Sequence, residues 1–291
     1  MFFTVTHTTT YSFSRPVFLE PHAIRLRPRS DGSQRLIRFE LTLEPRPAGL
    51  SECLDLDGNC VVHAWFDGLA ESLQVKTRCE VETLRRNAFD YIVSPPSANR
   101  LPLEYPTDLR LPLRPYCSRD GSDKPVRQFA NSIADEVDRQ TLPFLTALNR
   151  RVFEMCKVVT REEGGPQAPG ATLTQQRGAC RDLAVLFIDA CRALGLGARF
   201  VSGYQQGDPD QERRDLHAWA EVYLPGGGWR AYDPTHGLAV ADRHVAVAAG
   251  IHPALAAPII GTFRGTGVTS HMQADIEISV CRELSGNPVS T

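Results

Sequence analysis

The sequence predicts an α+β fold: an N-terminal antiparallel β-sandwich, then a core in which one buried helix packs on an antiparallel sheet. Three observations support this prediction. Strand-like runs separated by turn residues fill roughly the first 90 residues. Residues 180–194 are apolar nearly all round, as in a helix that is buried on most sides. Further strand-like runs follow that helix, which is typical of an α+β layout.

The first part, residues 1–92, contains the predicted sandwich. Its strand-like runs are β-branched, aromatic or alternating: residues 3–13, 36–43, 61–66 and 73–81. Turn residues such as Asp57 and Gly58 separate these runs. Short strands at this spacing predict an antiparallel sandwich.

The next segment, residues 93–118, is predicted to be an extended connector. It contains six prolines: Pro95, Pro96, Pro102, Pro106, Pro112 and Pro115. Because proline lacks a backbone N–H donor and its ring obstructs the preceding turn, a helix is not expected here.

The last part, residues 119–291, is predicted to be the core. Apolar residues recur at helix spacing in residues 126–137, and residues 141–155 give a second helix with Thr141 as its N-cap. The central helix ends at Gly195. Four strands are predicted after it: residues 198–203, 217–224, 229–232 and 273–281.

Composition limits the function classes. The formal net charge is -2, with 32 basic and 34 acidic residues, so no strong field for nucleic acid or anionic lipid exists. No apolar stretch approaches the roughly 20 residues of a membrane span. The N-terminal residues are predicted to be a strand, not a signal peptide. We therefore expect a cytoplasmic protein that has neither nucleic acid nor a membrane as a partner.

The eight cysteines show no CxxC pair and no regular spacing. A chain of 291 residues can bury enough apolar surface without disulfides, so reduced thiols are expected. The histidines and cysteines also lack the spacing of metal ligands. We therefore expect no metal and no cofactor.

Cys180 is the candidate nucleophile. It lies directly ahead of the apolar run, in the first turn of the predicted helix, where unpaired backbone N–H groups favour a thiolate. Its own backbone N–H is a natural donor to an oxyanion. The alternative is a structural core cysteine, which Cys191, well inside the same helix, represents.

His217 and Asp233 are the candidate partners of Cys180. Period-two alternation places His217 and Trp219 on one face of a strand, where the indole can shield the imidazole from water. Asp233 ends the next strand, because Pro234 stops it, and its carboxylate would hold the His217 tautomer and stabilise imidazolium. The alternatives are a solvated strand-end histidine and an aspartate that starts a turn before proline.

The hairpin between these two strands tests the pairing. A hairpin symmetric about residues 225–228 places His217 opposite His236. Asp233 then lies three residues before the position opposite His217, on the other face of the sheet, which is a distance of roughly 10 Å along the strand. One extra residue on either strand puts Asp233 diagonal to His217 on the same face. The pairing therefore requires a bulge or a lopsided loop.

Four blocks in this order resemble the bacterial transglutaminase-like core: Gly-Ala-Cys-Arg-Asp-Leu-Ala (178–184), Arg-Ala-Leu-Gly-Leu-Gly-Ala-Arg-Phe-Val-Ser-Gly-Tyr (192–204), His-Ala-Trp-Ala-Glu-Val-Tyr-Leu-Pro-Gly-Gly-Gly-Trp (217–229) and Asp-Pro-Thr-His-Gly (233–237). Residues 11–17 and 22–29 are similar to the domain that precedes this core in many bacterial members. The resemblance spans most of the chain. It implies a papain-like core with Cys180, His217 and Asp233 as a catalytic triad.

The second oxyanion donor is the least determined part of the site. Gln175 and Gln176 precede the cysteine and offer side-chain amides, although neither matches the spacing of the upstream glutamine in papain-like enzymes. Tyr204, after Ser202 and Gly203, is another candidate, with core packing as its alternative. Trp219 completes the oxyanion and substrate-binding candidates.

Two functions fit the sequence. The first is cysteine-dependent acyl transfer on amide bonds of peptides or proteins through a thioester. Hydrolysis is expected ahead of cross-linking. The superfamily that the chain resembles includes peptidases, amidases, acyltransferases and members without activity, and the chain has no calcium loop like that expected of the calcium-dependent tissue-type transglutaminases. The second is a non-catalytic peptide- or protein-binding module on the same fold. The complete trio favours the enzyme, because a binder has no need of all three residues.

Overall fold

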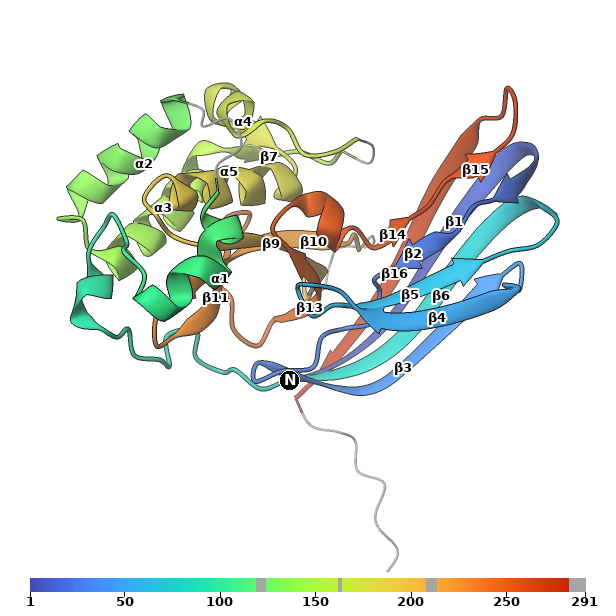
Figure 1. Ribbon diagram of the computed structural model, residues 1–291, viewed down its shortest axis with the longest axis horizontal. Helices are drawn as coiled ribbons and strands as arrows, with labels where there is room; N and C mark the ends of the chain where they lie inside the picture. Colours follow the sequence, from blue (N-terminus) through green and yellow to red (C-terminus); the bar gives the residue numbers. More distant parts are fainter. Residues whose placement is uncertain (119–123, 162–163, 208–213, 283–291) are drawn as a thin grey trace, which may run out of the picture.

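The computed structural model describes residues 1–118, 124–161, 164–207 and 214–282 of the chain (Figure 1). Two lobes lie side by side: one of helices around a sheet, and one of long antiparallel strands. Among the described strands, only the short β7 (Lys157–Val158) and β8 (Arg177–Gly178) pair in parallel. The α+β prediction is confirmed.

The strand lobe consists of two antiparallel sheets. The first contains β1 (Phe2–Leu19), β3 (Gln34–Glu44), β6 (Leu69–Thr83), β15 (Phe263–Arg264) and β16 (Ser270–Cys281). The second contains β2 (His22–Ile24), β4 (Gly49–Leu54), β5 (Cys60–Trp65) and β14 (Ile259–Ile260). Inward-facing side chains of both sheets, among them Leu19, Val62 and Val75, form one hydrophobic core. Alternating polar and apolar residues produce this one-sided burial.

The C-terminal strands return to the strand lobe. β16 pairs with β1 from Phe2 opposite Cys281 to Phe13 opposite Ser270. The expected core therefore does not run to residue 291, because the chain leaves it after β13 (His244–Gly250) and completes the first sheet. The physical reason is that β1 has β6 on one edge only, and β16 supplies the hydrogen bonds of the other edge.

The proline-rich segment is not extended throughout, so that expectation is wrong. Thr107–Cys117 form helix α1, and Pro96–Asn99 form a 3-10 turn, η1. Pro112 and Pro115 lie inside α1, where each deprives a single carbonyl of its helical donor. Burial of Leu113 in the core of the helical lobe offsets this loss.

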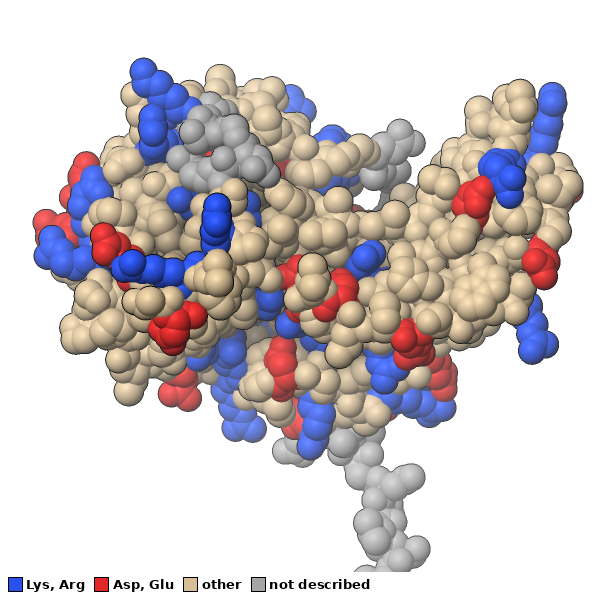
Figure 2. Space-filling model, in the orientation of Figure 1, with Lys and Arg blue, Asp and Glu red and all other residues tan. Residues whose placement is uncertain are grey.

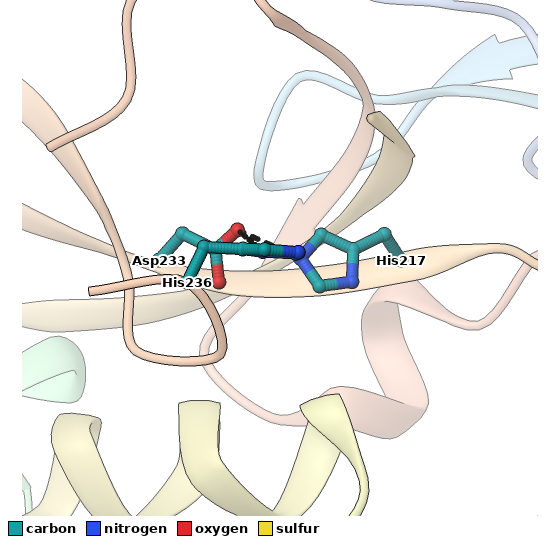
Figure 3. A group of neighbouring side chains, drawn as sticks. All are labelled: His217, Asp233 and His236. Atoms are coloured by element: carbon teal, nitrogen blue, oxygen red, sulfur yellow. Dashed lines mark hydrogen bonds and ion pairs between the residues drawn. The ribbon is translucent and has the colours of Figure 1, made fainter. Parts of the chain in front are cut away.

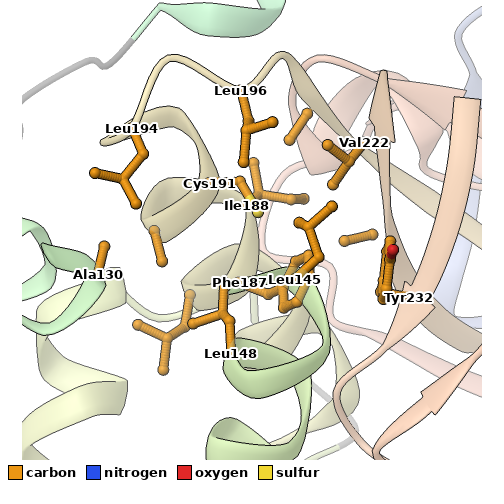
Figure 4. Close-up of a cluster of buried hydrophobic side chains, with 14 of the residues drawn as sticks. Ala130, Leu145, Leu148, Phe187, Ile188, Cys191, Leu194, Leu196, Val222 and Tyr232 are labelled. Atoms are coloured by element: carbon orange, nitrogen blue, oxygen red, sulfur yellow. The ribbon is translucent and has the colours of Figure 1, made fainter. Parts of the chain in front are cut away.

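The helical lobe is built around α5 (Cys180–Arg192), the helix that the sequence predicts to be buried. Three helices pack against it: α2 (Lys124–Glu136), α3 (Thr141–Met155) and α4 (Pro169–Gln175). Its other side faces a sheet of order β12-β11-β10-β9-β13, made of β9 (Ala198–Gln205), β10 (His217–Leu224), β11 (Gly228–Asp233), β12 (Leu238–Ala239) and β13. Phe187, Ile188 and Cys191 fill the space between these layers (Figure 4). The helix is therefore enclosed between the other helices and the sheet, while Cys180 and Arg181 in its first turn stay partly exposed.

Thr141 begins α3 but is not its N-cap, contrary to expectation. Gln140 occupies the cap position and makes no side-chain capping bond. The hydroxyl of Thr141 instead donates to the carbonyl oxygen of Ala98 at 2.7 Å. Because this hydroxyl is fully buried, it requires a partner, and η1 supplies one.

Acidic and basic side chains are interspersed over the face of the molecule shown in Figure 2. None of the described helices combines the length and the apolar character needed to cross a membrane. All eight cysteines are free, and Cys180 is a partly exposed residue.

Candidate active site

Cys180 occupies the first turn of α5, where backbone N–H groups have no helical carbonyl to bond. Ala179 ahead of it is extended, with φ -77° and ψ 167°. A Cβ atom on Gly178 would lie 2.8 Å from the Cβ of Asp182, so the approach of the chain to the helix requires glycine. The local sequence therefore dictates where the thiol stands.

Asp182 is a buried organiser of this helix start that the sequence analysis missed. Its Oδ2 accepts the backbone N–H of Ala179 at 2.8 Å, as the third residue of a capping box does. Its Oδ1 accepts a hydrogen bond from Arg161 at 2.6 Å and the backbone N–H of Gln167 at 2.7 Å. The carboxylate thus ties the segment before α4 to the helix that carries Cys180. An aspartate three residues after the cap position was the available sequence signal.

His217 links the other two candidate residues. Its Nε2 lies 2.8 Å from Oδ2 of Asp233. Hydrogen bonding and charge interaction between Cys180 and His217 both act on the imidazole. Because Asp233 engages Nε2, Nδ1 is the ring nitrogen that remains for the thiol. The structure therefore brings Cys180, His217 and Asp233 together where β10 begins and β11 ends.

The register of the β10–β11 hairpin is shifted by one residue from a hairpin symmetric about residues 225–228, as the pairing of His217 with Asp233 requires. Leu224 pairs with Gly228, so Gly228 belongs to the strand and the loop consists of residues 225–227. Continued to the strand ends, this register sets Asp233 diagonal to His217 on the same face. Gly228 adopts φ +70°, a conformation that favours glycine. This allows β11 to begin at Gly228, one residue before the start that a symmetric hairpin gives.

Asp233 is fully buried, and one of its carboxylate oxygens lies within hydrogen-bonding distance of three imidazole rings. Oδ2 lies 2.8 Å from Nε2 of His217, 2.8 Å from Nδ1 of His236 and 3.0 Å from Nε2 of His244. Oδ1 accepts the backbone N–H of Thr235 at 2.9 Å. Figure 3 shows the rings of His217 and His236 turned toward the carboxylate. Neither His236 nor His244 is predicted from the sequence to belong to the site, and only His236, three residues after Asp233, was detectable by proximity.

The residues around Asp233 have different charge states at neutral pH. Burial lowers the pKa of His217, but the charge and hydrogen bond of Asp233, assisted by Cys180, raise it to about 10 overall. Burial works against the Asp233 carboxylate, yet the charge of His217 and the imidazole donors hold its pKa well below the usual range. Burial also lowers the pKa of His244. At neutral pH, His217 is therefore an imidazolium beside a carboxylate, and His244 is a neutral donor.

Trp219 lies beside the imidazoles, as expected. It is 1% exposed, and its ring centroid is 6.1 Å from that of His217. It also meets the ring of His244 edge-on, with 5.1 Å between centroids. The indole thus excludes water from one side of the network.

Tyr204 and the two glutamines lie elsewhere. Tyr204 is fully buried, and its hydroxyl is 2.9 Å from Nδ1 of His7, which joins β9 to β1 of the strand lobe. Core packing, the alternative considered for Tyr204, describes its position. Gln175 and Gln176 are exposed at the C-terminal end of α4, and none of the described contacts brings either amide to Cys180.

The donor atoms of His217, Asp233 and His236 lie within 4.8 Å of one another. Imidazole nitrogen and carboxylate oxygen are ligands that zinc accepts. Spacing along the chain gave no sign of such a set, because the hairpin creates it. Both imidazoles already hydrogen-bond to the Asp233 carboxylate. A metal ion would therefore compete with these bonds and with the imidazolium–carboxylate pair.

Two family models match this chain. Residues 3–82 match the bacterial transglutaminase-like N-terminal region, and residues 127–234 match the transglutaminase-like superfamily. The chain is 20% identical to a candidate cysteine protease from Cytophaga hutchinsonii of known crystal structure. The TM-score is 0.71, and the match covers 98% of this chain and 92% of that chain. This likeness shows a shared fold across both lobes.

Relatives by sequence include an uncharacterized protein of Mycobacterium tuberculosis. It is 28% identical over 293 residues, which cover 95% of this chain and 90% of the relative. A protein-glutamine gamma-glutamyltransferase of Pseudomonas aeruginosa is 36% identical over 69 residues, which are 21% of this chain and 10% of that protein.

Proposed function

Because this chain belongs to the transglutaminase-like superfamily, we propose that it is a cysteine-dependent acyl-transfer enzyme acting on amide bonds of peptides or proteins. In this proposal Cys180 is the nucleophile, His217 transfers protons and Asp233 orients His217. The observation that supports it best is the imidazole of His217, which is 2.8 Å from Asp233 and interacts with Cys180 at a helix start. A helix N-terminus and an imidazolium are what stabilises a thiolate.

The proposed reaction has two stages. The Cys180 sulfur attacks the amide carbonyl carbon, the C–N bond breaks, and Nδ1 of His217 gives its proton to the leaving amine. The acyl group then remains as a thioester. In the second stage water attacks the thioester while His217 accepts a proton, and the C–S bond breaks to release the acid and restore the thiolate. The backbone N–H of Cys180 donates to the oxyanion in both stages.

We place hydrolysis ahead of cross-linking. Water reaches any open thioester, whereas cross-linking also requires a site that recognises an amine. The match to the Pseudomonas aeruginosa transferase covers 69 residues and so does not decide between the two outcomes. A glutamine-containing peptide incubated with a labelled primary amine separates them: hydrolysis yields glutamate and ammonia, and cross-linking incorporates the label.

Selective alkylation tests the proposal without a known substrate. The intact protein is treated with iodoacetamide near neutral pH, and mass spectrometry compares Cys180 with Cys53, which is exposed in the strand lobe. Preferential modification of Cys180 is expected. Equally slow modification of all eight thiols would overturn the proposal of an enzyme and favour the peptide- or protein-binding module.

We further propose a cytoplasmic location and a reaction that needs no metal or cofactor, with neither nucleic acid nor a membrane as partner. Eight free cysteines suit a reducing compartment. Fractionation of cells that express the tagged full chain tests the location, and recovery outside the cytoplasmic fraction would contradict it.

A further inference from the structure

His244 reaches the site from a strand that the proposed reaction does not use. We propose that His244 is a positioning residue that holds the Asp233 carboxylate against His217, and that the strand lobe holds His244 in place through the backbone of β13. This inference rests on the proposed function of Cys180, His217 and Asp233.

The contact between His244 and Asp233 is direct and enclosed. Nε2 of His244 lies 3.0 Å from Oδ2 of Asp233, and the residue is only 5% exposed. Its Nδ1 is buried without a hydrogen-bond partner among the described residues. An unpartnered buried nitrogen destabilises a fold. An apolar side chain would avoid that loss, so the donated N–H is the property that requires histidine here.

The charges around His244 explain why a neutral donor is useful. Asp233 from β11, His217 from β10 and His236 after β11 face the ring, and Trp219 covers it. His217 carries the positive charge of the network. A neutral N–H fixes the carboxylate oxygen without competing with His217 for a proton.

Side-chain amides of the strand lobe hold the outer edge of β13. In the helical lobe this strand has β9 on one side only. Gln34 donates to the carbonyl of Ala246 at 2.8 Å and accepts its N–H at 2.7 Å. Asn59 makes the same pair with Ala249, at 2.6 Å and 2.8 Å. Each amide therefore pairs with β13 as a neighbouring strand would, and the backbone N–H of Arg29 also donates to the carbonyl of Ala246, at 3.1 Å.

Both amides are themselves buried, Gln34 to 2% exposure and Asn59 to 1%. A third contact precedes His244, where the Thr83 hydroxyl donates to the carbonyl of Asp242 at 2.8 Å. His244 thus lies between Asp242 and Ala246, whose backbone groups both hydrogen-bond to side chains of the strand lobe. The strand lobe is therefore connected to the Asp233 carboxylate through the backbone of this segment and the side chain of His244.

The central experiment compares two His244 variants of the full chain. His244→Gln keeps an N–H donor near the position of Nε2, whereas His244→Leu keeps the buried volume and removes the donor. The readout is the rate of Cys180 alkylation by iodoacetamide at pH 7 and pH 10. We expect His244→Leu to be slower than wild type by about 10-fold or more at pH 7, because a hydrogen bond to a charged group is lost. His244→Gln should recover most of the rate.

The pH profile separates positioning from stability. At pH 10 a thiol of ordinary pKa near 8.5 is a thiolate whatever its neighbours do, so the three rates should converge to within a few-fold. A purely structural role would make His244→Leu, which buries apolar surface, at least as good as His244→Gln. That order of rates, or a deficit that persists at pH 10, would overturn the proposal.

A second pair of variants tests the strand lobe. Gln34→Leu removes both hydrogen bonds to Ala246, and the one to the carbonyl of Arg29, and should slow Cys180 alkylation at pH 7 by several-fold. Gln74→Leu is the matched control, since among the described residues the Gln74 amide bonds only Thr10, within the strand lobe, at 3.4 Å. Equal rates in the two variants would exclude a link from Gln34 through Ala246 to His244. Unselective labelling of the wild-type protein would instead reject the proposed function itself.

Discussion

His217 and Asp233 are sixteen residues apart in the chain, yet Nε2 of His217 lies 2.8 Å from Oδ2 of Asp233. A three-residue hairpin loop produces this contact. Because Asp233 is fully buried, its negative charge depends on the imidazoles around it. The proposed chemistry and the local stability therefore depend on the same pair of side chains.

Cys180→Ala should abolish amide cleavage or transfer, by about a thousandfold or more, because none of the other described residues places a nucleophile beside His217. The fold should persist, since only one sulfur atom is removed from a partly exposed residue at a helix start. Thermal unfolding followed by circular dichroism, alongside the activity assay, checks both parts. Activity retained in a folded Cys180→Ala protein would reject the nucleophile.

Asp233→Asn should lower kcat more than it raises KM, because Asp233 contacts His217 and not the substrate. The amide can still accept a hydrogen bond but cannot stabilise imidazolium by charge. The loss should be smaller than for Cys180→Ala, since the nucleophile and the oxyanion donor remain. Steady-state kinetics measures both constants, and a change confined to KM would contradict the orienting role.

The free energy of unfolding should depend on the charge of His217. Its pKa is about 10 in the folded protein and about 6.5 when unfolded. A raised pKa stabilises the fold fully below the unfolded value, and this contribution disappears as pH rises through the folded value. The advantage of wild type over His217→Gln in urea unfolding should therefore shrink from pH 6.5 to pH 10. A difference that stays constant over that range would mean that His217 does not hold the extra proton.

EDTA should leave activity unchanged, because the proposed mechanism uses no metal. Added zinc should slow alkylation of Cys180 by binding the donors of His217, Asp233 and His236, which lie within 4.8 Å. His236→Ala should weaken the zinc effect, while His271→Ala, an exposed histidine on β16, should not. Activity lost in EDTA and restored by a divalent ion would refute metal independence.

A fragment of residues 1–118 should not fold into a stable monomer. It contains β1 but lacks β16, so one edge of an 18-residue strand would be exposed. Size-exclusion chromatography and chemical denaturation of the fragment check this expectation. A monomeric fragment with cooperative unfolding would show that the strand lobe is independent of the C-terminal strands.

Local patterns predicted much of the helical lobe. The apolar run after Cys180 became α5, and the expected strand at residues 217–224 matches β10, His217–Leu224. Periodicity identifies such elements because it reflects which face each residue buries. The helix within the proline-rich segment was missed because burial of Leu113 outweighs an unfavourable local propensity.

The sequence by itself determined the α+β class, the buried helix that begins at Cys180, and the three residues proposed to act together. It also showed that His217 and Asp233 could meet only across an uneven hairpin. Only the tertiary structure decided that the loop has three residues, that β16 pairs with β1, and that His236 and His244 join Asp233. These facts depend on strand register between distant segments, where a shift of one residue turns a side chain to the opposite face. No local pattern in the chain encodes that choice.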